Sequence, residues 1–192
     1  MISDFNKLPE TFPFTFGKDN DIIDPVELAT DLVKNMRDNN LLGLSANRLG
    51  YNYRVIALTH DPNIVCFNPR IVQLSEETIE LEEASSMFPG LFIKISRPKH
   101  LRVRYQQPNE ETITKQFTGL TAREIQHQID VLDRKPFYDN ASWSERARIL
   151  KKWKIWKRRS KNGTNERLRN SLLDTSRNST SLDTFTYSSP VT

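Results

Sequence analysis

Residues 125–134 read IQHQIDVLDR and lie largely within a helix that we predict over about 121–132. A zinc-hydrolase helix of the H-E-x-x-H type places two histidines four residues apart, with a glutamate beside the first. Here His127 is present, but Gln128 stands at the glutamate position and Val131 at the position of the second histidine. The stretch therefore has the pattern of a metal-binding helix in which the working side chains are replaced.

The composition indicates one domain with appended segments. The chain has 192 residues with 36% hydrophobic content and a mean hydropathy of -0.62, which is low for a wholly globular chain of this length. A single cysteine, Cys66, excludes an internal disulfide framework and fits a reducing compartment. We expect a soluble protein without membrane contact, because no apolar run approaches the ~18–20 residues of a membrane span and no signal-peptide pattern opens the chain.

Changes in composition divide the chain into four segments. We expect an N-terminal arm at 1–20, a domain at 21–140, a basic Trp-rich helix at 141–160 and a polar tail at 161–192. Half of the tail is Ser, Thr or Asn, so on its own it should be disordered.

Local patterns predict an α+β domain. Asp24 and Pro25 mark the start of a helix, as N-cap and first helical residue, and apolar side chains at 28, 32, 33 and 36 share one of its faces. A further helix, the third expected in the chain, is predicted over 144–157, capped by Ser142 or Ser144. Breaks are expected at Asp61-Pro62 and Asn68-Pro69. Predicted strands are 53–60, 64–72, 91–98, 100–108 and 110–118.

Three segments carry a resemblance to a known family. GLSANRLG at 43–50, EASSMFPG at 83–90 and QHQIDVL at 126–132 are similar, in order and spacing, to G-L-A-A-x-Q-x-G, E-G-C-L-S-x-P-G and Q-H-E-x-D-H-L of peptide deformylases. These are metal-dependent enzymes that remove the formyl group from nascent polypeptides, and compact versions are common in tailed phages. The resemblance covers about 8–140. It implies a peptide-deformylase-like fold, with antiparallel strands packed around a central helix that carries the former metal motif.

The metal-binding positions depart from the family pattern. In the family a Cys thiolate and two helical histidines bind the metal. Here Ser85 stands at the cysteine position and Val131 at that of the second histidine, which leaves His127. A neutral hydroxyl is a poor replacement for a thiolate, and valine has no lone pair. We expect no metal and no cofactor.

The catalytic positions depart as well. The family's catalytic glutamate corresponds to Gln128, and its oxyanion-binding glutamine corresponds to Arg48. General acid–base catalysis contributes about 10² to 10⁴ in rate and one oxyanion donor about 10² to 10³. Without metal, water keeps a pKa near ~15.7 instead of about 7. We therefore expect a pseudoenzyme, with no catalytic residues. The expected vestigial pocket contains Arg48, Ser85, Ser86, His127, Gln128 and Val131.

Simpler interpretations stand beside these. His127 is expected to be a buried helix histidine bonded to a neighbour, and Cys66 a buried, inert thiol. Arg48 is expected to be exposed or salt-bridged, although it could meet an anionic group in the pocket. Ser85 and Ser86 read as small polar loop residues.

The basic Trp-rich helix is expected to bind a partner. Residues 146–161, RARILKKWKIWKRRSK, are rich in Lys and Arg and contain no acid, and all three tryptophans lie between 143 and 156. Interleaved tryptophans favour a docking surface over a solvated helix. The expected partner-binding residues are Trp143, Trp153, Trp156, Lys151, Lys152, Lys154, Lys157, Arg158 and Arg159.

Three functions compete. The favoured one is a non-catalytic structural or docking component of a tailed-phage virion, in the tail, baseplate or neck, that contacts other protein subunits through the basic helix and the tail. It would be made in the host cytoplasm, and outside a virion the chain would be cytoplasmic. The alternatives are a peptide deformylase with an atypical site, and a nucleic-acid or ribosome-surface binder acting through the basic helix. The old pocket could also hold a chain end without cleaving it.

Overall fold

The computed structural model describes residues 1–17, 23–60 and 62–161. It contains two compact units, Met1–Ile149 and a second that begins at Leu150. The helices are α1 (Pro25–Asp38), α2 (Gly119–Leu132) and α3 (Trp143–Lys161), with 3₁₀ turns η1 (Phe5–Lys7), η2 (Ala46–Leu49) and η3 (Phe137–Asn140). The strands are β1 (Gly43–Ser45), β2 (Val55–Leu58), β3 (Ile64–Leu74), β4 (Thr78–Ala84), β5 (Phe92–Pro98), β6 (His100–Gln106) and β7 (Thr112–Thr118).

The first helix begins where its cap predicts. Asp24 accepts hydrogen bonds from the backbone N–H groups of Val26 at 2.8 Å and Glu27 at 3.0 Å, and Pro25 takes the first helical position. These bonds satisfy donors that a helix start otherwise leaves unpaired. The predicted cap and the start of α1 are confirmed.

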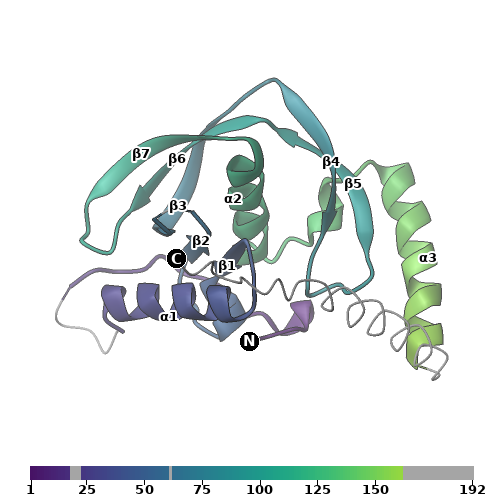
Figure 1. Ribbon diagram of the computed structural model, residues 1–192, viewed down its shortest axis with the longest axis horizontal. Helices are drawn as coiled ribbons and strands as arrows, with labels where there is room; N and C mark the ends of the chain where they lie inside the picture. Colours follow the sequence, from purple (N-terminus) through teal and green to yellow (C-terminus); the bar gives the residue numbers. More distant parts are fainter. Residues whose placement is uncertain (18–22, 61, 162–192) are drawn as a thin grey trace, which may run out of the picture. The chain divides into compact units, whose positions relative to one another are not determined.

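The α+β fold class is confirmed, with antiparallel strands around a central helix. Five strands form one sheet in the order β1-β2-β3-β6-β7, and β4 and β5 form a separate antiparallel pair. Helix α2 contacts β1 and β2 of the large sheet and β5 of the pair. Figure 1 shows α2 between the two groups of strands, with α1 across the other side of β1 and β2.

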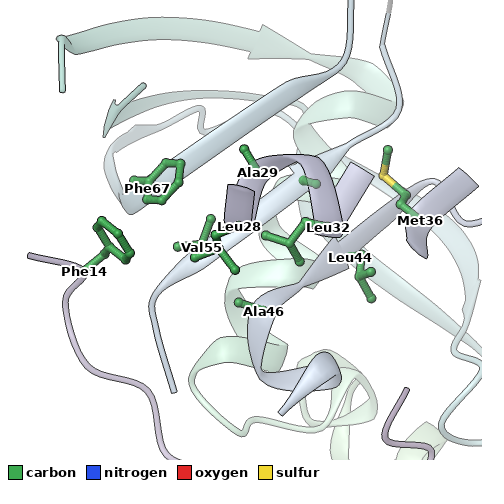
Figure 2. Packing of buried hydrophobic residues seen from close by; sticks show 10 residues of the cluster. Phe14, Leu28, Ala29, Leu32, Met36, Leu44, Ala46, Val55 and Phe67 are labelled. Carbon is green, nitrogen blue, oxygen red and sulfur yellow. The ribbon is translucent and has the colours of Figure 1, made fainter. Parts of the chain in front are cut away.

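Strand β2 separates two hydrophobic clusters because its side chains alternate between the faces of the sheet. Val55 and Ala57 join α1 in one cluster, shown in Figure 2, together with Phe14 from the N-terminal arm. Ile56 and Leu58 join α2 in the other cluster. The sheet is therefore covered on both faces, and α2 has a fixed position against it.

Asn68-Pro69 makes a bulge inside β3 and does not end the strand, which differs from the expected break. Asn68 adopts a φ of 51°, and the pairing of β3 with β6 shifts register there. Its side chain accepts from Phe14 N at 2.7 Å and donates to Phe14 O at 2.9 Å and Gln106 Oε1 at 2.8 Å. A bulge allows one extra residue while pairing resumes beyond it, and here it fastens the arm to the sheet.

Strands β1 and β4 were not predicted, whereas the other five strands and all three α-helices were. In β4 the apolar Ile79 and Leu81 alternate with polar residues, a signal that its many acidic side chains obscured. α3 begins at Trp143, with Glu145 N donating to Ser142 Oγ at 3.3 Å. Within the described residues no helix is long and apolar enough to cross a membrane. The predicted tail, apart from Lys161, lies outside the described residues.

We predict that Asn68→Ala lowers the free energy of unfolding by about 4 kcal/mol, because it removes three side-chain hydrogen bonds worth roughly 1 kcal/mol each and places Ala at a positive φ that costs about 1 kcal/mol. Asn40 has the same φ of 51° on the surface and no side-chain hydrogen bond in the described residues. Asn40→Ala therefore controls for the backbone and should cost about 1 kcal/mol. Urea denaturation measures both variants, and equal losses would show that the bonds of Asn68 contribute nothing.

Candidate functional site

A cavity of about 370 Å³ lies against α2 and is lined by residues of all three sequence motifs. Its walls come from the chain before and within β1, from the end of β4 with the turn that follows, and from one face of α2. The lining residues are Asn40, Leu41, Leu42, Gly43, Arg48, Leu81, Glu82, Glu83, Ala84, Ser85, Ser86, Met87, Leu120, Arg123, Glu124, His127, Gln128 and Val131.

The first motif packs its backbone closely on α2. A Cβ atom at Gly43 would lie 2.6 Å from Glu124 Oε1, so a side chain at this position would displace Glu124. The buried Asn47 donates from Nδ2 to the Val131 carbonyl at 2.9 Å. These contacts place β1 and η2 directly against the helix turn that carries the former metal motif.

The second motif turns the chain beside Arg48. Phe88 N donates to Ser85 O at 2.9 Å, which closes the turn after β4. Arg48 Nη1 donates to Ser86 Oγ at 3.0 Å, and Arg48 Nε lies 3.5 Å from Ile2 O. The Arg48 side chain thus links η2, this turn and the N-terminal arm.

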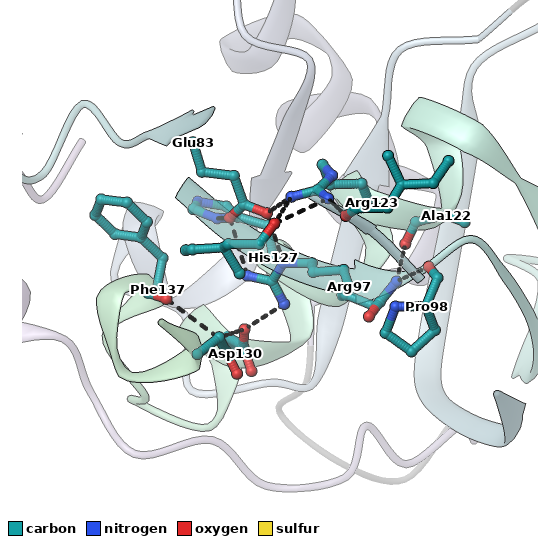
Figure 3. A network of polar contacts seen from close by, with 12 residues as sticks. Glu83, Arg97, Pro98, Ala122, Arg123, His127, Asp130 and Phe137 are labelled. Carbon is teal, nitrogen blue, oxygen red and sulfur yellow. Dashed lines mark hydrogen bonds and ion pairs between the residues drawn. The ribbon is translucent and has the colours of Figure 1, made fainter. Parts of the chain in front are cut away.

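A buried ionic network joins β4, β5 and α2 (Figure 3). Arg97 donates to both oxygens of Glu83, at 2.6 and 3.0 Å, and to Asp130 Oδ2 at 2.8 Å. Arg123 donates to Glu83 as well, and also to the carbonyls of β4 and β5. His127 presents Nδ1 at 3.6 Å from Glu83 Oε2. Two guanidinium groups therefore surround one carboxylate, which faces the imidazole.

The network keeps Glu83 ionised. Burial alone would raise the pKa of this carboxyl, but hydrogen bonds from His127 and Arg97 and the charge of Arg97 lower it to about 2. A carboxylate held in this way fixes the orientation of the histidine ring, because Nδ1–H then has one preferred acceptor.

The structure brings the six predicted pocket residues together in the one cavity. His127 is nearly buried and contacts Glu83 and the ring of Phe137, in agreement with the simpler interpretation. Cys66 is fully buried, and burial raises the pKa of its thiol. Arg48 differs from its expectation, since it is 6% exposed and makes no ion pair among the described residues.

Sequence reasoning did not assign a role to several side chains at this site. Glu83 and Asp130 fall inside the quoted motifs, and Arg123 precedes His127 by one helical turn, so motif membership and helical spacing were the available signals. The exposed leucines at the cavity, Leu42 and Leu120, carried no such signal.

The side chains present do not fit the metal that the resemblance implies. His127 is the one remaining ligand type at the three positions, Ser85 offers a neutral hydroxyl, and Val131 is a buried hydrocarbon. Across the described ranges, no group of three or more His, Cys, Asp or Glu side chains is placed to hold a metal ion. We therefore derive no chemistry through a metal.

The predicted partner surface lies on α3. Trp143 is 77% exposed and Trp156 41% exposed, and Lys157 Nζ lies 4.9 Å from the ring centre of Trp153. Trp143 does not share a helix face with the other two tryptophans, because at about 100° per residue Trp153 lies about 80° and Trp156 about 140° around the helix from it. The Arg159 side chain lies outside the described residues.

Comparisons with known proteins identify relatives along most of the domain. The family model described as Polypeptide deformylase matches residues 17–147, more than half of the chain. A peptide deformylase of Bartonella tribocorum is 32% identical over 73% of this chain and 82% of its own length. A peptide deformylase-like protein of Agrobacterium fabrum is 34% identical over 66% and 79%. The peptide deformylase structure from Thermus thermophilus has a TM-score of 0.70 at 25% identity, covering 80% of this chain and 90% of that one.

These findings overturn the prediction that the chain is not an enzyme. Relatives at 31–35% identity are named peptide deformylase, which is an enzyme, and the similar solved structures are deformylases. The prediction relied on the replaced metal-binding positions and on Gln128 and Arg48 at the catalytic positions, whereas the structure keeps His127 beside Glu83. With a family model matched over most of its length and a fold shared with solved deformylases, the chain belongs to the polypeptide deformylase family.

Proposed function

We propose that this chain acts as a deformylase on the N-terminal end of polypeptides, with the cavity beside α2 as its substrate site. The observation that carries the proposal is the meeting of all three family motifs around that one cavity. The named substrate of the family, a formylated polypeptide, presents a small amide group followed by an extended chain.

Open strand edges flank the cavity and suit an extended peptide. β1 is an end strand of the large sheet, and β4 pairs with β5 alone among the described strands. Leu42 and Gly43 line one side of the cavity, and the end of β4 lines the other. An added peptide strand can satisfy the unpaired N–H and C=O groups of such edges.

Exposed leucines at the cavity suit an apolar side chain. Leu42, Leu81 and Leu120 line the cavity and are 66%, 40% and 69% exposed. Large apolar side chains gathered at a concave site commonly mark a binding surface. An apolar first residue, as in a chain that starts with methionine, would cover them.

The chemistry proposed for this site uses His127 as general base. With Nδ1–H directed to Glu83, Nε2 is the nitrogen that accepts a proton from water. The water oxygen attacks the formyl carbon, and the Arg48 guanidinium stabilises the negative oxygen that forms. The C–N bond then breaks, His127 returns its proton to the leaving amine, and the products are formate and a free peptide N-terminus.

Formate release from a formyl-Met tripeptide tests this proposal. We expect release above the uncatalysed rate in the presence of a chelator, which silences metal-dependent deformylases of an expression host. His127→Asn should lower the rate by about 10² or more, whereas His60→Asn on the surface should leave it unchanged. Absence of wild-type release, or equal rates in His127→Asn, would contradict the proposal. Activity that appears only without chelator would contradict the proposed role of His127.

The position of His127 depends on Glu83, and the lowered pKa of this carboxyl predicts how stability changes with pH. Because folding lowers the Glu83 pKa from 4.5 to about 2, its contribution is present above pH 4.5 and is lost as pH falls toward 2. The free energy of unfolding of wild type should exceed that of Glu83→Gln by about 3 kcal/mol near neutral pH. This difference should shrink as pH falls from 4.5 toward 2. Exposed Glu80→Gln on the same strand is the control. Denaturation at a series of pH values measures the effect, and a difference that does not change with pH would contradict it.

A second candidate function is docking of α3 to an acidic protein surface, which we propose on its exposed cations and rings. Lys151, Lys152 and Lys154 are exposed on a helix that has no acid after Glu145. Arg146 and Arg148 are paired, with Asp139 and Glu145 respectively. The location of such a partner in a phage virion stays a prediction.

Replacing Lys151, Lys152 and Lys154 with Glu should abolish binding of a labelled poly-glutamate peptide, because the helix then repels it. The matched control replaces three exposed lysines of the other compact unit, Lys7, Lys34 and Lys94, with Glu. Fluorescence anisotropy at 50 and 200 mM salt measures both. Tighter and more strongly salt-dependent binding of single-stranded RNA of equal charge would favour the nucleic-acid alternative.

A further inference from the structure

Among the residues that the structure describes, three arginines are buried, and one of them lacks a compensating carboxylate. Arg48, Arg97 and Arg123 are 6%, 4% and 9% exposed. Arg97 and Arg123 are paired with acidic side chains. In the described part of the chain, Arg48 contacts neutral oxygens and makes no ion pair.

An uncompensated buried charge costs free energy, because the lost hydration is not replaced. Burial lowers the pKa of the Arg48 guanidinium, yet arginine keeps its charge in proteins. Arg48 lines the cavity, where an anion from solvent could reach it. An anionic group bound there would offset the cost.

The donors around Arg48 suit a carboxylate. Nη1 and Nε of Arg48 have the acceptors described above, while Nη2 has none among the described residues. Ser86 uses its hydroxyl oxygen as acceptor and keeps its hydrogen to donate. Nη2 and the Ser86 hydroxyl can therefore each donate to one oxygen of a carboxylate, in the charge-assisted arrangement that arginine favours.

The charges that line the cavity favour a monovalent anion over a multivalent one. Glu82, Glu83 and Glu124 also line it, and Glu124 makes no ion pair among the described residues. One guanidinium balances one negative charge, and a doubly charged phosphate would meet greater repulsion from these carboxylates.

We propose that Arg48 and Ser86 form a carboxylate-binding site in the cavity beside α2. Two sources share this chemistry. One is formate, and this arm rests on the proposed function because deformylation releases formate there. The other is the C-terminal carboxylate of a peptide, which requires no reaction at the site.

Titration of the full chain by calorimetry and by amide NMR shifts tests the site at constant ionic strength. The probes are sodium formate, an N-acetylated trialanine with a free C-terminal carboxylate, and the same peptide with a C-terminal amide. We expect saturable binding of at least one carboxylate and none of the amide. Arg48→Gln should weaken binding tenfold or more and Ser86→Ala about threefold, while exposed Arg102→Gln should change it less than twofold.

Thermal unfolding shows whether a variant loses binding because it is less stable or because the binding site is changed. Without ligand, the unfolding temperature of Arg48→Gln should be no lower than that of wild type, because an uncompensated charge is removed. Arg97→Gln should unfold at a lower temperature than wild type, because its carboxylate partners lose their cation. Formate or the carboxylate peptide should raise the midpoint of wild type but not of Arg48→Gln.

The outcomes separate the two proposals. Absence of saturable carboxylate binding to wild type, or equal affinity in Arg48→Gln, overturns the site even if formate release is observed. Carboxylate binding that depends on Arg48 supports the site even if no formate is released, and that result contradicts the proposed deformylation alone. Binding of formate alone identifies a product site, and binding of the peptide alone identifies a chain-end site.

Discussion

The ion pair between Glu83 and Arg97 is the contact on which the site depends. The two residues lie on neighbouring strands, and Arg97 extends the contact to Asp130 on α2. Because β4 and β5 form a sheet separate from the other five strands, these buried charges hold the pair of strands to the helix. Breaking one partner would leave an uncompensated charge in the interior, which is more costly than losing an apolar contact. The cavity wall and the orientation of His127 follow from this arrangement.

The same physical constraint explains why Arg48 is unusual. Arg97 and Arg123 lie deep in the protein because Glu83 compensates them, and their charges are used in holding secondary structure together. Arg48 is equally buried but its contacts are to Ser86 and to the backbone of the N-terminal arm. A fold that tolerates such a charge at the wall of a cavity has a place for an anion, whereas a charge buried away from any cavity would have none.

The relationship to deformylases and the substituted metal positions have to be considered together. The replaced metal-binding and catalytic positions, taken by themselves, led to the wrong expectation about enzymatic character. The histidine that remains lies beside an ionised glutamate, 3.6 Å from it, and this carboxylate can orient the imidazole ring. The residues at the motif positions do not supply a metal site. The packing nevertheless orients an imidazole in a cavity with open strand edges.

The sequence by itself determined the elements and the family. Capping at Asp24, alternation in 91–108 and the three spaced motifs depend on neighbours in the chain, so local patterns were sufficient. The same patterns missed β1, which is too short to show a period, and the bulge at Asn68, whose conformation depends on Phe14. The tertiary structure alone decided which charges are compensated. Glu83 meets Arg97 and Arg123, and Arg48 meets no carboxylate, because of how the strands and α2 pack. Compensation of a buried charge is a property of three-dimensional distance, and no one-dimensional pattern records it.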